Sequence, residues 1–313
     1  MVWVKRDDLT GFATAGNKAR SLEFLIGDAL AQHCDVLVTG GGAGSNFCAA
    51  AAAAARAAGM DCDLVLYGTD PDAGDAGHLH PNLSAARESG AHVQFTGRPD
   101  RDEIDGAIAQ RGAELAVDGR RPYVMPRGGA TAVGAVGFAL AFEELSGQLA
   151  AAGVDPGVVV VATGSGGTQA GLVAGQARAA ARGATATRAY PRILGATVSR
   201  PPAQILETVT NLSRQCGALL DLPIARAEDV DIVDARGAGF GVPSPPGERA
   251  RRIAYETEGL ILDPVYSAKA FGVVLDLIAE GFRQPIVFWH TGGLPAAIHH
   301  MTTTSERSAL CPT

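Results

Sequence analysis

The sequence predicts an α/β fold whose parallel sheets are covered by helices on both faces. Short apolar strands alternate with helical segments along nearly the whole chain, an order of elements typical of parallel sheets. Residues 158–161 form a continuous β-branched run bounded by glycine-containing turns, as expected for a central parallel strand. Neither a repeat of fixed period nor a low-complexity linker occurs. Two domains, if present, therefore share the chain discontinuously or pack closely.

The same patterns place the elements in chain order. The first helix is amphipathic, because Leu22, Leu25, Ile26, Ala29 and Leu30 recur at helical spacing. Strands are expected at residues 2–5, 36–38, 63–67, 92–95, 123–125, 158–161, 193–198, 230–233 and 286–289. Helices are expected at residues 16–30, 47–58, 83–89, 103–117, 130–150, 169–181, 203–220, 248–258 and 268–280. Segment 68–81 is expected to be a loop, and the polar tail 302–313 to fray.

Composition argues against several classes of function. The chain has 313 residues, 47% hydrophobic and 19% charged, which suits a globular protein with a large core. A net charge of −7 without a basic cluster argues against nucleic-acid binding, and the Ala-rich run 49–58 is too short to span a membrane. Five scattered cysteines without a CxxC pair suggest reduced thiols in the cytoplasm, with Cys48 and Cys62 in the core. Neither the pair His78 and His80 nor the pair at 299–300 has zinc-ligand spacing, so no metal is expected.

Lysine is scarce in this chain, and its position is informative. Only Lys5, Lys18 and Lys269 occur among 26 basic residues. A lysine can deprotonate and attack an aldehyde, whereas an arginine cannot. Lys18 stands at the start of the first predicted helix, so it is a candidate Schiff-base lysine for pyridoxal phosphate. The alternative is a solvated lysine at a helix start, which is the common role of an exposed lysine.

A Gly-rich loop follows the central strand and precedes a helix. Exposed N–H groups at such a helix N-terminus bind anions, and hydroxyl groups add donors. The loop is neither a Walker A sequence nor GxGxxG, so a single phosphate monoester is the expected ligand. The alternative is a tight turn with glycines for geometry alone. Its residues are Thr163, Gly164, Ser165, Gly166, Gly167 and Thr168.

Two further segments carry candidate site residues. Ser45 and Asn46 end a second Gly-rich turn, where they would either cap the following helix or hold a substrate carboxylate. Ser267 would either cap a later helix or hydrogen-bond a pyridine nitrogen, and Tyr266 could act as an acid or base. His290 lies at a strand's carboxyl end, where α/β sites lie, although a lone histidine there is more often structural.

These segments, in this order, resemble the family of D-cysteine desulfhydrase and 1-aminocyclopropane-1-carboxylate (ACC) deaminase. The similar stretches are Lys5-Arg6-Asp7-Asp8-Leu9-Thr10-Gly11 with Gly16-Asn17-Lys18, Ser45-Asn46, the loop 163–168, Asp263-Pro264-Val265-Tyr266 and His290-Thr291-Gly292-Gly293. The resemblance implies the type II fold of pyridoxal-phosphate (PLP) enzymes. This fold has two three-layer α/β/α domains with mostly parallel sheets. Residues 21–135 would form the smaller domain, and 1–20 with 136–313 the larger PLP-binding domain. A homodimer is implied as well.

The resemblance also assigns roles to residues. Lys18 would form the Schiff base, and Gly164 to Thr168 would hold the cofactor phosphate. Asn46 would contact the ring hydroxyl and Ser45 the substrate carboxylate. Tyr266 would be the active-site tyrosine, and Ser267 would face the pyridine nitrogen.

The chain departs from the family at positions that bear on the substrate. Gly44 and Phe47 flank Ser45 and Asn46 where the family has glutamine and histidine, and Phe240 stands where it has a second tyrosine. ACC deaminases carry a glutamate at the position of Ser267. A carboxylate there would keep the pyridine protonated, and a serine does so less well. This difference favours β-elimination or β-replacement over opening of a cyclopropane ring.

We therefore predict a PLP-dependent lyase that releases a keto acid and ammonia from a small amino acid with a β leaving group. This is the reaction type of D-cysteine desulfhydrase. A β-replacement synthase of the cysteine-synthase type is the first alternative, followed by ACC deaminase. A catalytically degraded member that serves as a binding subunit is another, and a phosphate-sugar binder without PLP is the most distant.

Overall fold

The computed structural model describes residues 1–71, 80–182, 190–222 and 225–310, and within them nine strands form two parallel sheets. The five-stranded sheet has the order β1-β9-β6-β7-β8, and the four-stranded sheet the order β4-β3-β2-β5. The strands are β1 (Val2–Arg6), β2 (Val36–Gly41), β3 (Asp61–Leu66), β4 (His92–Phe95), β5 (Pro122–Val124), β6 (Val158–Thr163), β7 (Arg192–Thr197), β8 (Asp231–Asp234) and β9 (Ile286–His290).

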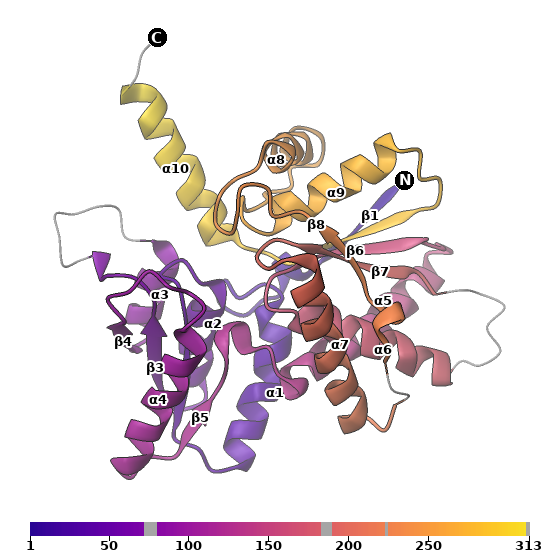
Figure 1. Cartoon of the computed structure of the whole chain (residues 1–313). Coiled ribbons are helices and arrows are strands. Elements are labelled where there is room, and N and C mark those ends of the chain that lie inside the picture. The colour runs from indigo at the N-terminus through magenta and orange to yellow at the C-terminus, as the bar shows by residue number, and fades with distance from the viewer. Residues whose placement is uncertain (72–79, 183–189, 223–224, 311–313) are drawn as a thin grey trace.

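Helices connect the strands and lie on both faces of each sheet (Figure 1). Their bounds are α1 (Lys18–Ala31), α2 (Asn46–Ala57), α3 (Pro81–Glu88), α4 (Ile104–Val117), α5 (Ala132–Ala151), α6 (Gly167–Arg182), α7 (Pro202–Leu219), α8 (Pro245–Glu258), α9 (Ser267–Ala279) and α10 (Leu294–Leu310). Short 3-10 helices occur at η1 (Asp7–Leu9), η3 (Arg127–Gly129) and η4 (Ala227–Asp229).

The five-stranded sheet is the middle of three layers. Successive strand residues point to opposite faces, so the run in β6 serves two cores. Val159 and Val161 pack with α5, α6 and α7, whereas Val158 and Val160 pack with α8 and α9. All four valines are at most 1% exposed. The uninterrupted apolar run that predicted this strand therefore reflects burial on both faces.

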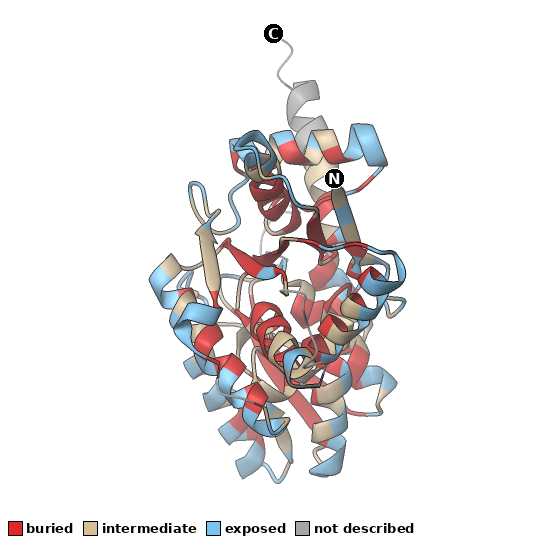
Figure 2. Cartoon of the chain, turned by 90° about the vertical axis from the view of Figure 1, so that its right-hand side faces the viewer, coloured by how far each residue is buried: buried red, intermediate tan, exposed pale blue. Residues whose placement is uncertain are grey.

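The four-stranded sheet repeats this arrangement on a smaller scale. Leu37 of β2 packs with residues of α1, α2 and α3, whereas Val36 and Val38 pack with α4 on the other face. The buried residues form continuous bands through the sheets and the inner faces of the helices, and the exposed residues lie on the outer helix faces (Figure 2). The predicted fold class, two three-layer α/β/α units with parallel sheets, is confirmed.

The two sheets take their strands from different parts of the chain. Residues 36–124 supply the four-stranded sheet, whereas 2–6 and 158–290 supply the five-stranded one. On this basis we propose that residues 21–135 form the smaller domain and residues 1–20 with 136–313 the larger one. In the part of the chain that is described, no helix has the length and apolar content needed to cross a bilayer.

Several element boundaries differ from those expected. Strands β2 and β6 continue to Gly41 and Thr163, because these residues still pair with the neighbouring strands β3 and β7. The tail expected to fray from residue 302 is helical in α10 as far as Leu310. The hydroxyls of Thr302 and Thr303 bond to carbonyls three and four residues earlier, so these polar residues remain compatible with a helix. Leu30 is 47% exposed and does not share the buried face of α1.

Candidate functional site

A cavity of about 420 Å³ lies at the carboxyl ends of strands from both sheets. Its wall includes residues of the turn after β2, the loop after β6 and the segment 291–293 after β9, together with Lys18. Ligands of open parallel sheets bind in this position, and the volume lies within the range of about 300–1,000 Å³ seen for small-molecule sites. The cavity is therefore the candidate active site.

Lys18 is the first residue of α1, and its backbone is held between two loops of the cavity wall. The backbone N–H of Asn17 donates to the Thr291 carbonyl at 3.0 Å, and its side-chain amide donates to the Thr168 hydroxyl at 3.0 Å. Gly16 has a φ of +54°, and a Cβ at this position would lie 2.5 Å from the Thr291 oxygen. The predicted stretch Gly16-Asn17-Lys18 thus places the lysine at a defined point of the cavity.

Lys18 is the one lysine of the chain whose ammonium makes no hydrogen bond to the described residues. The Lys5 ammonium is paired with Glu144, and the Lys269 ammonium donates to the carbonyls of Arg236 and Gly239 at 2.7 and 2.9 Å. Lys18 keeps some accessible surface because it faces the cavity, although protein atoms crowd around it. This burial lowers the pKa of Lys18 to about 8, against the opposing charge of Asp263. The geometry favours the amine role over the solvated-lysine alternative.

The loop after β6 has the features of an anion site. Gly166 has a φ of +98°, which lets the chain turn directly into α6, whose first N–H groups have no partner within the helix. Ser165 and Thr168 line the cavity with their neighbours Gly164 and Gly166. Thr163 also lines the cavity, but its hydroxyl is already engaged. The Thr163 hydroxyl donates to the side chain of Gln169 at 2.9 Å, and Gly167 is not among the described residues that line the cavity.

Ser45 and Asn46 both line the cavity, on the side of the four-stranded sheet. Ser45 is the N-cap of α2, because its hydroxyl accepts a hydrogen bond from the Cys48 N–H at 3.2 Å. The Asn46 side-chain oxygen accepts from the Asn82 amide at 2.7 Å. The capping role proposed as an alternative for Ser45 is therefore confirmed. The same geometry leaves both side chains at the cavity wall, where a carboxylate could bind.

Tyr266 and Ser267, the two residues predicted at the start of α9, lie in different environments. Tyr266 lines the cavity, and burial raises the pKa of its hydroxyl. Ser267 is fully buried and does not line the cavity in the described chain; its hydroxyl donates to the Asp263 carboxylate at 2.6 Å. Asp263 itself lines the cavity and accepts the backbone N–H groups of Tyr266 and Ser267 at 2.9 and 2.8 Å. A carboxylate, rather than the predicted hydroxyl, thus faces the cavity at this point.

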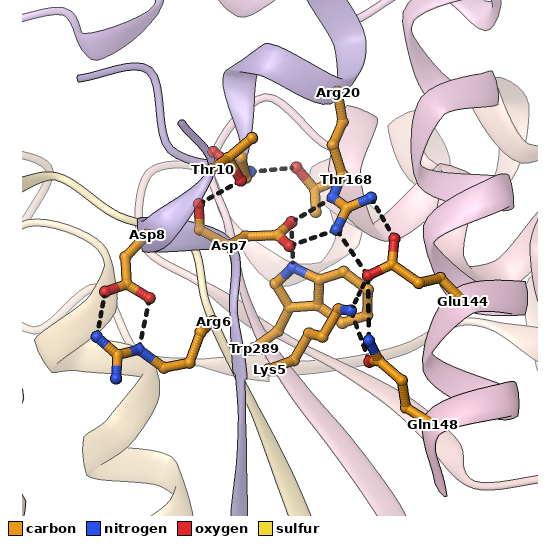
Figure 3. Close-up of polar contacts among 11 residues, drawn as sticks. Lys5, Arg6, Asp7, Asp8, Thr10, Arg20, Glu144, Gln148, Thr168 and Trp289 are labelled. Atoms are coloured by element: carbon orange, nitrogen blue, oxygen red, sulfur yellow. Dashed lines mark hydrogen bonds and ion pairs between the residues drawn. The ribbon is translucent and has the colours of Figure 1, made fainter. Parts of the chain in front are cut away.

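A partly buried polar network links α1, the helix that begins at Lys18, to neighbouring elements (Figure 3). The Asp7 carboxylate accepts both arms of the Arg20 guanidinium at 2.8 and 2.9 Å and the Trp289 indole N–H at 2.8 Å. Arg20 also bonds to Glu144 of α5, which pairs with Lys5 of β1. The network joins β1, α1, α5 and β9. No sequence pattern indicates it, because Asp7 and Trp289 are 282 residues apart.

Three arginines in the cavity wall were missed by the sequence analysis. Arg101, Arg127 and Arg200 follow the carboxyl ends of β4, β5 and β7, respectively. Their positions after strands were the available signal, because residues at these ends converge on one site in a parallel sheet. Tyr67 after β3 lines the cavity for the same reason.

Histidines also reach the cavity, without forming a metal site. The rings of His80 and His299 are in contact, with centroids 4.7 Å apart and planes inclined by 54°, and both residues line the cavity. Burial lowers the pKa of His80 to about 4, with a smaller contribution from His299. Among the described residues no group of three His, Cys, Asp or Glu side chains is arranged to hold a metal ion, and His78 lies outside those residues. His290 is buried and accepts the Gly292 N–H, which agrees with a structural role.

Comparison with known proteins gives consistent relatives over almost the whole chain. The family model described as "Pyridoxal-phosphate dependent enzyme" matches residues 1–292. Proteins of Pyrococcus furiosus and Pyrococcus abyssi, each named "Putative 1-aminocyclopropane-1-carboxylate deaminase", are 34% identical over 300 residues. In both cases the match covers 96% of this chain and 86% of the relative.

Solved structures agree with these sequence relatives. A crystal structure described as an ACC deaminase homologue superposes with a TM-score of 0.85 at 33% identity, and the match covers 97% of this chain and 88% of that one. A crystal structure of a T.th. threonine deaminase has a TM-score of 0.65 at 19% identity, over 93% of this chain and 87% of that one. The threonine deaminase supports the fold alone. The ACC deaminase homologue supports fold and family together.

Proposed function

The chain belongs to the family of pyridoxal-phosphate dependent enzymes, and we propose that it is a lyase acting on a small amino acid with a β leaving group. The products are a keto acid and ammonia, as in a D-cysteine desulfhydrase-type reaction. The observation that carries the proposal is Lys18, an amine with a pKa lowered to about 8 that lines the same cavity as the loop before α6, whose N-terminus suits an anion.

The residues present fit the cofactor of this family. We propose that Ser165, Gly166 and Thr168 hold its phosphate with the first N–H groups of α6. The unbonded amine of Lys18 would bind its aldehyde carbon, and Asn46 would approach its ring hydroxyl. For the pyridine nitrogen, the proposed contact with Ser267 would have to pass through Asp263, since the serine hydroxyl is bonded to that carboxylate. When bound, PLP supplies an electron sink for the α-carbon of the substrate.

The remaining chemistry falls to side chains of this protein. The Lys18 amine, released by the incoming amino group, would take the α-proton of the substrate, since a buried lysine with a pKa near 8 is a competent base at neutral pH. Tyr266 keeps its proton over the physiological range, because burial raises the pKa of its hydroxyl. It could therefore donate that proton to the departing β group. Ser45 and the turn before it would hold the substrate carboxylate.

ACC deamination is the second candidate, favoured by the names of the relatives and by the Asp263 carboxylate in the cavity wall. A carboxylate near the pyridine would strengthen the electron sink that ring opening needs. β-Replacement is the third candidate. A serine near the pyridine nitrogen, or a carboxylate already hydrogen-bonded to one as Asp263 is to Ser267, also permits it. These reactions differ in substrate and product, so one screen separates them.

The screen measures pyruvate, 2-oxobutyrate and ammonia from the holoenzyme supplied with both enantiomers of cysteine and β-chloroalanine, and with ACC. We expect equimolar pyruvate and ammonia from at least one three-carbon substrate and no 2-oxobutyrate from ACC. Addition of a thiol should leave the yield of pyruvate unchanged. If thiol consumes substrate without pyruvate, the enzyme is a β-replacement synthase; 2-oxobutyrate from ACC would identify a deaminase of that compound.

The lowered pKa of Lys18 predicts how cofactor capture depends on pH. Only the neutral amine attacks an aldehyde, and its fraction rises about tenfold per pH unit below the pKa and levels off above it. With a pKa of about 8, the rate at which apoprotein binds pyridoxal should rise to about pH 8 and then flatten. Stopped-flow absorbance between pH 6 and 11 measures this. A rate that continues to rise up to about pH 10.4, the value of a free lysine, would contradict the burial of Lys18.

Assembly and location complete the proposal. The family resemblance favours a homodimer, and reduced cysteines favour the cytoplasm. Cys48 and Cys62 are 3% and 5% exposed, and burial raises the pKa of the Cys48 thiol to about 11, so neither is a ready nucleophile. Size-exclusion chromatography with light scattering tests the dimer.

A further inference from the structure

The cavity wall contains a guanidinium that the proposed reaction of a simple amino acid does not use. Arg101 lies in the loop between β4 and α4, on the side of the four-stranded sheet. Its guanidinium carbon lies 4.1 Å from the centre of the Phe240 ring, which belongs to the chain of the five-stranded sheet. Phe240 in turn meets the edge of Tyr266, with ring centres 5.9 Å apart. Arg101, Phe240 and Tyr266 all line the cavity, so these contacts form a row in its wall.

Arg101 has no anionic partner among the described residues. Its Nε is buried without a hydrogen bond, and its guanidinium forms neither a hydrogen bond nor an ion pair within those residues. The two neighbouring arginines are engaged: Arg127 approaches Asp102 at 3.8 Å and bonds to the Arg101 carbonyl, and Arg200 donates to the Thr208 hydroxyl at 3.4 Å. A guanidinium that is partly desolvated and unpaired is costly, so a bound anion would relieve it.

The electrostatic surroundings of Arg101 also favour a bound anion. Burial lowers its pKa, and the positive charge of Arg127 lowers it further, against weaker opposing effects of Tyr67, Asp102 and Tyr266. Burial and then Arg127 also lower the pKa of Arg200, against an opposing effect of Asp105. The three arginines line the cavity, whereas Asp102 and Asp105 are not among its described lining residues. Asp263, a buried carboxylate of the wall, acts on the charge of Lys18 and is not among the residues that affect Arg101.

Two anions of the proposed reaction already have candidate sites. The cofactor phosphate has the N-terminus of α6, and the substrate α-carboxylate has the turn at Ser45. Arg101 offers a planar fork of N–H donors, the geometry that binds carboxylate, sulfonate or phosphate groups through two parallel hydrogen bonds. Its contact with Phe240, whose ring meets Tyr266, places this fork one aromatic ring away from the tyrosine proposed to serve the β leaving group.

We propose, resting on the lyase function above, that the substrate carries an acidic group on its β-carbon, a sulfonate or a phosphate ester, and that Arg101 binds it. In the elimination the α-proton passes to Lys18, and the bond from the β-carbon to sulfur or oxygen breaks. Sulfite or phosphate leaves with that electron pair while a double bond forms between the α- and β-carbons. Water hydrolyses the imine form of the resulting 2-aminoacrylate to pyruvate and ammonium. Arg101 stabilises the negative charge of the departing group.

The first test compares substrates on the holoenzyme. Both enantiomers of cysteate and O-phosphoserine carry the acidic group, and β-chloroalanine carries a neutral one. We expect kcat/KM to be higher for an acidic substrate. In Arg101→Met the ratio of kcat/KM for acidic over neutral substrate should fall about 10²-fold, the effect of removing one partner of a buried charge pair. Arg101→Lys should recover part of that ratio, since it keeps the charge without the fork.

The control is Arg98→Met, which removes the same charge three residues earlier, where Arg98 is exposed and paired with Glu103 outside the cavity. It should leave the ratio unchanged. Wild-type enzyme that turns over β-chloroalanine but no acidic substrate overturns the proposal. A parallel loss for all substrates in Arg101→Met assigns Arg101 to the α-carboxylate instead, and loss of the cofactor's visible band assigns it to the phosphate; either result also overturns the proposal.

A second test does not depend on turnover. Calorimetry measures binding of 3-sulfopropionate and of propionate to the holoenzyme, as analogues with and without the second anion. We expect tighter binding of 3-sulfopropionate, and a loss of about 10²-fold in Arg101→Met but not in Arg98→Met. Equal affinities for the two acids would refute the acidic-substrate proposal even if the lyase function holds. Conversely, selective binding of 3-sulfopropionate without turnover of any amino acid would contradict the lyase function alone.

Discussion

Replacing Lys18 by alanine is expected to abolish turnover and, at the same time, the visible absorption band of the bound cofactor. The amine of Lys18 faces the cavity without a hydrogen bond to the described residues, so it is the group available to link the aldehyde and to remove the α-proton. Loss of a group with both roles should lower kcat by at least about 10³-fold. Absorbance spectra and the pyruvate assay measure the two effects on one preparation.

Two other variants make this result specific. Lys5→Ala removes a lysine whose ammonium pairs with Glu144 and does not line the cavity, so the visible band should remain in the fraction of protein that is folded. Lys18→Arg keeps the positive charge but cannot form the imine, so it should lose the band as Lys18→Ala does. A Lys18→Ala protein that retains the band would refute the role of Lys18 as the cofactor-linking residue.

Replacing Asp7 by alanine is expected to lower the free energy of unfolding by about 3–5 kcal/mol, the cost of leaving a buried ion pair without one partner. Asp7 is 1% exposed and holds the Arg20 guanidinium through two hydrogen bonds as well as the Trp289 indole N–H. Without it, the indole N–H of Trp289 stays buried without a partner, and the partly buried Arg20 keeps only Glu144. Urea unfolding of the apoprotein, followed by circular dichroism, gives the free energy.

Asp234→Ala is the matched control, since Asp234 also holds an arginine, Arg236, through two hydrogen bonds but lies on the surface with 44% exposure. An exposed pair contributes about 0–1 kcal/mol, so this variant should remain close to the wild type. Equal effects of the two substitutions would show that the Asp7 network does not stabilise the fold. Because Arg20 lies two residues after Lys18 in α1, Asp7→Ala should also weaken cofactor binding, in proportion to the fraction that remains folded.

Much of the fold could be predicted because its signals are local. The period of apolar residues distinguishes strand from helix, and the run in β6 indicates burial on both faces. Boundaries were less certain. β2 continues through Gly41 because β3 pairs with it that far, and pairing with another strand cannot be derived from glycine content.

The candidate site was predictable to the extent that its residues lie at the boundaries of helices and strands. Lys18, Ser45, Ser165 and Tyr266 each lie at the start of a helix that follows a strand or a turn, and the structure brings all four to one cavity. The positions of parallel strand ends made this convergence predictable. Arg101 was not found, because its loop contains no glycine-rich turn and its importance depends on Phe240, 139 residues away.

The sequence by itself determined the class of the fold, the lysine available for imine chemistry and the helix terminus suited to a phosphate. These follow from the spacing of residues within one element and from the few lysines that the chain contains. Only the tertiary structure decided which carboxylate faces the cavity, which arginine is left without a partner and which pairs stabilise α1. Asp263 faces the cavity because the buried Ser267 hydroxyl turns back to it. Hydrogen bonds extend over about 3 Å, so the pairs that stabilise α1 depend on packing between segments far apart in the chain, as the contact of Arg101 with Phe240 does.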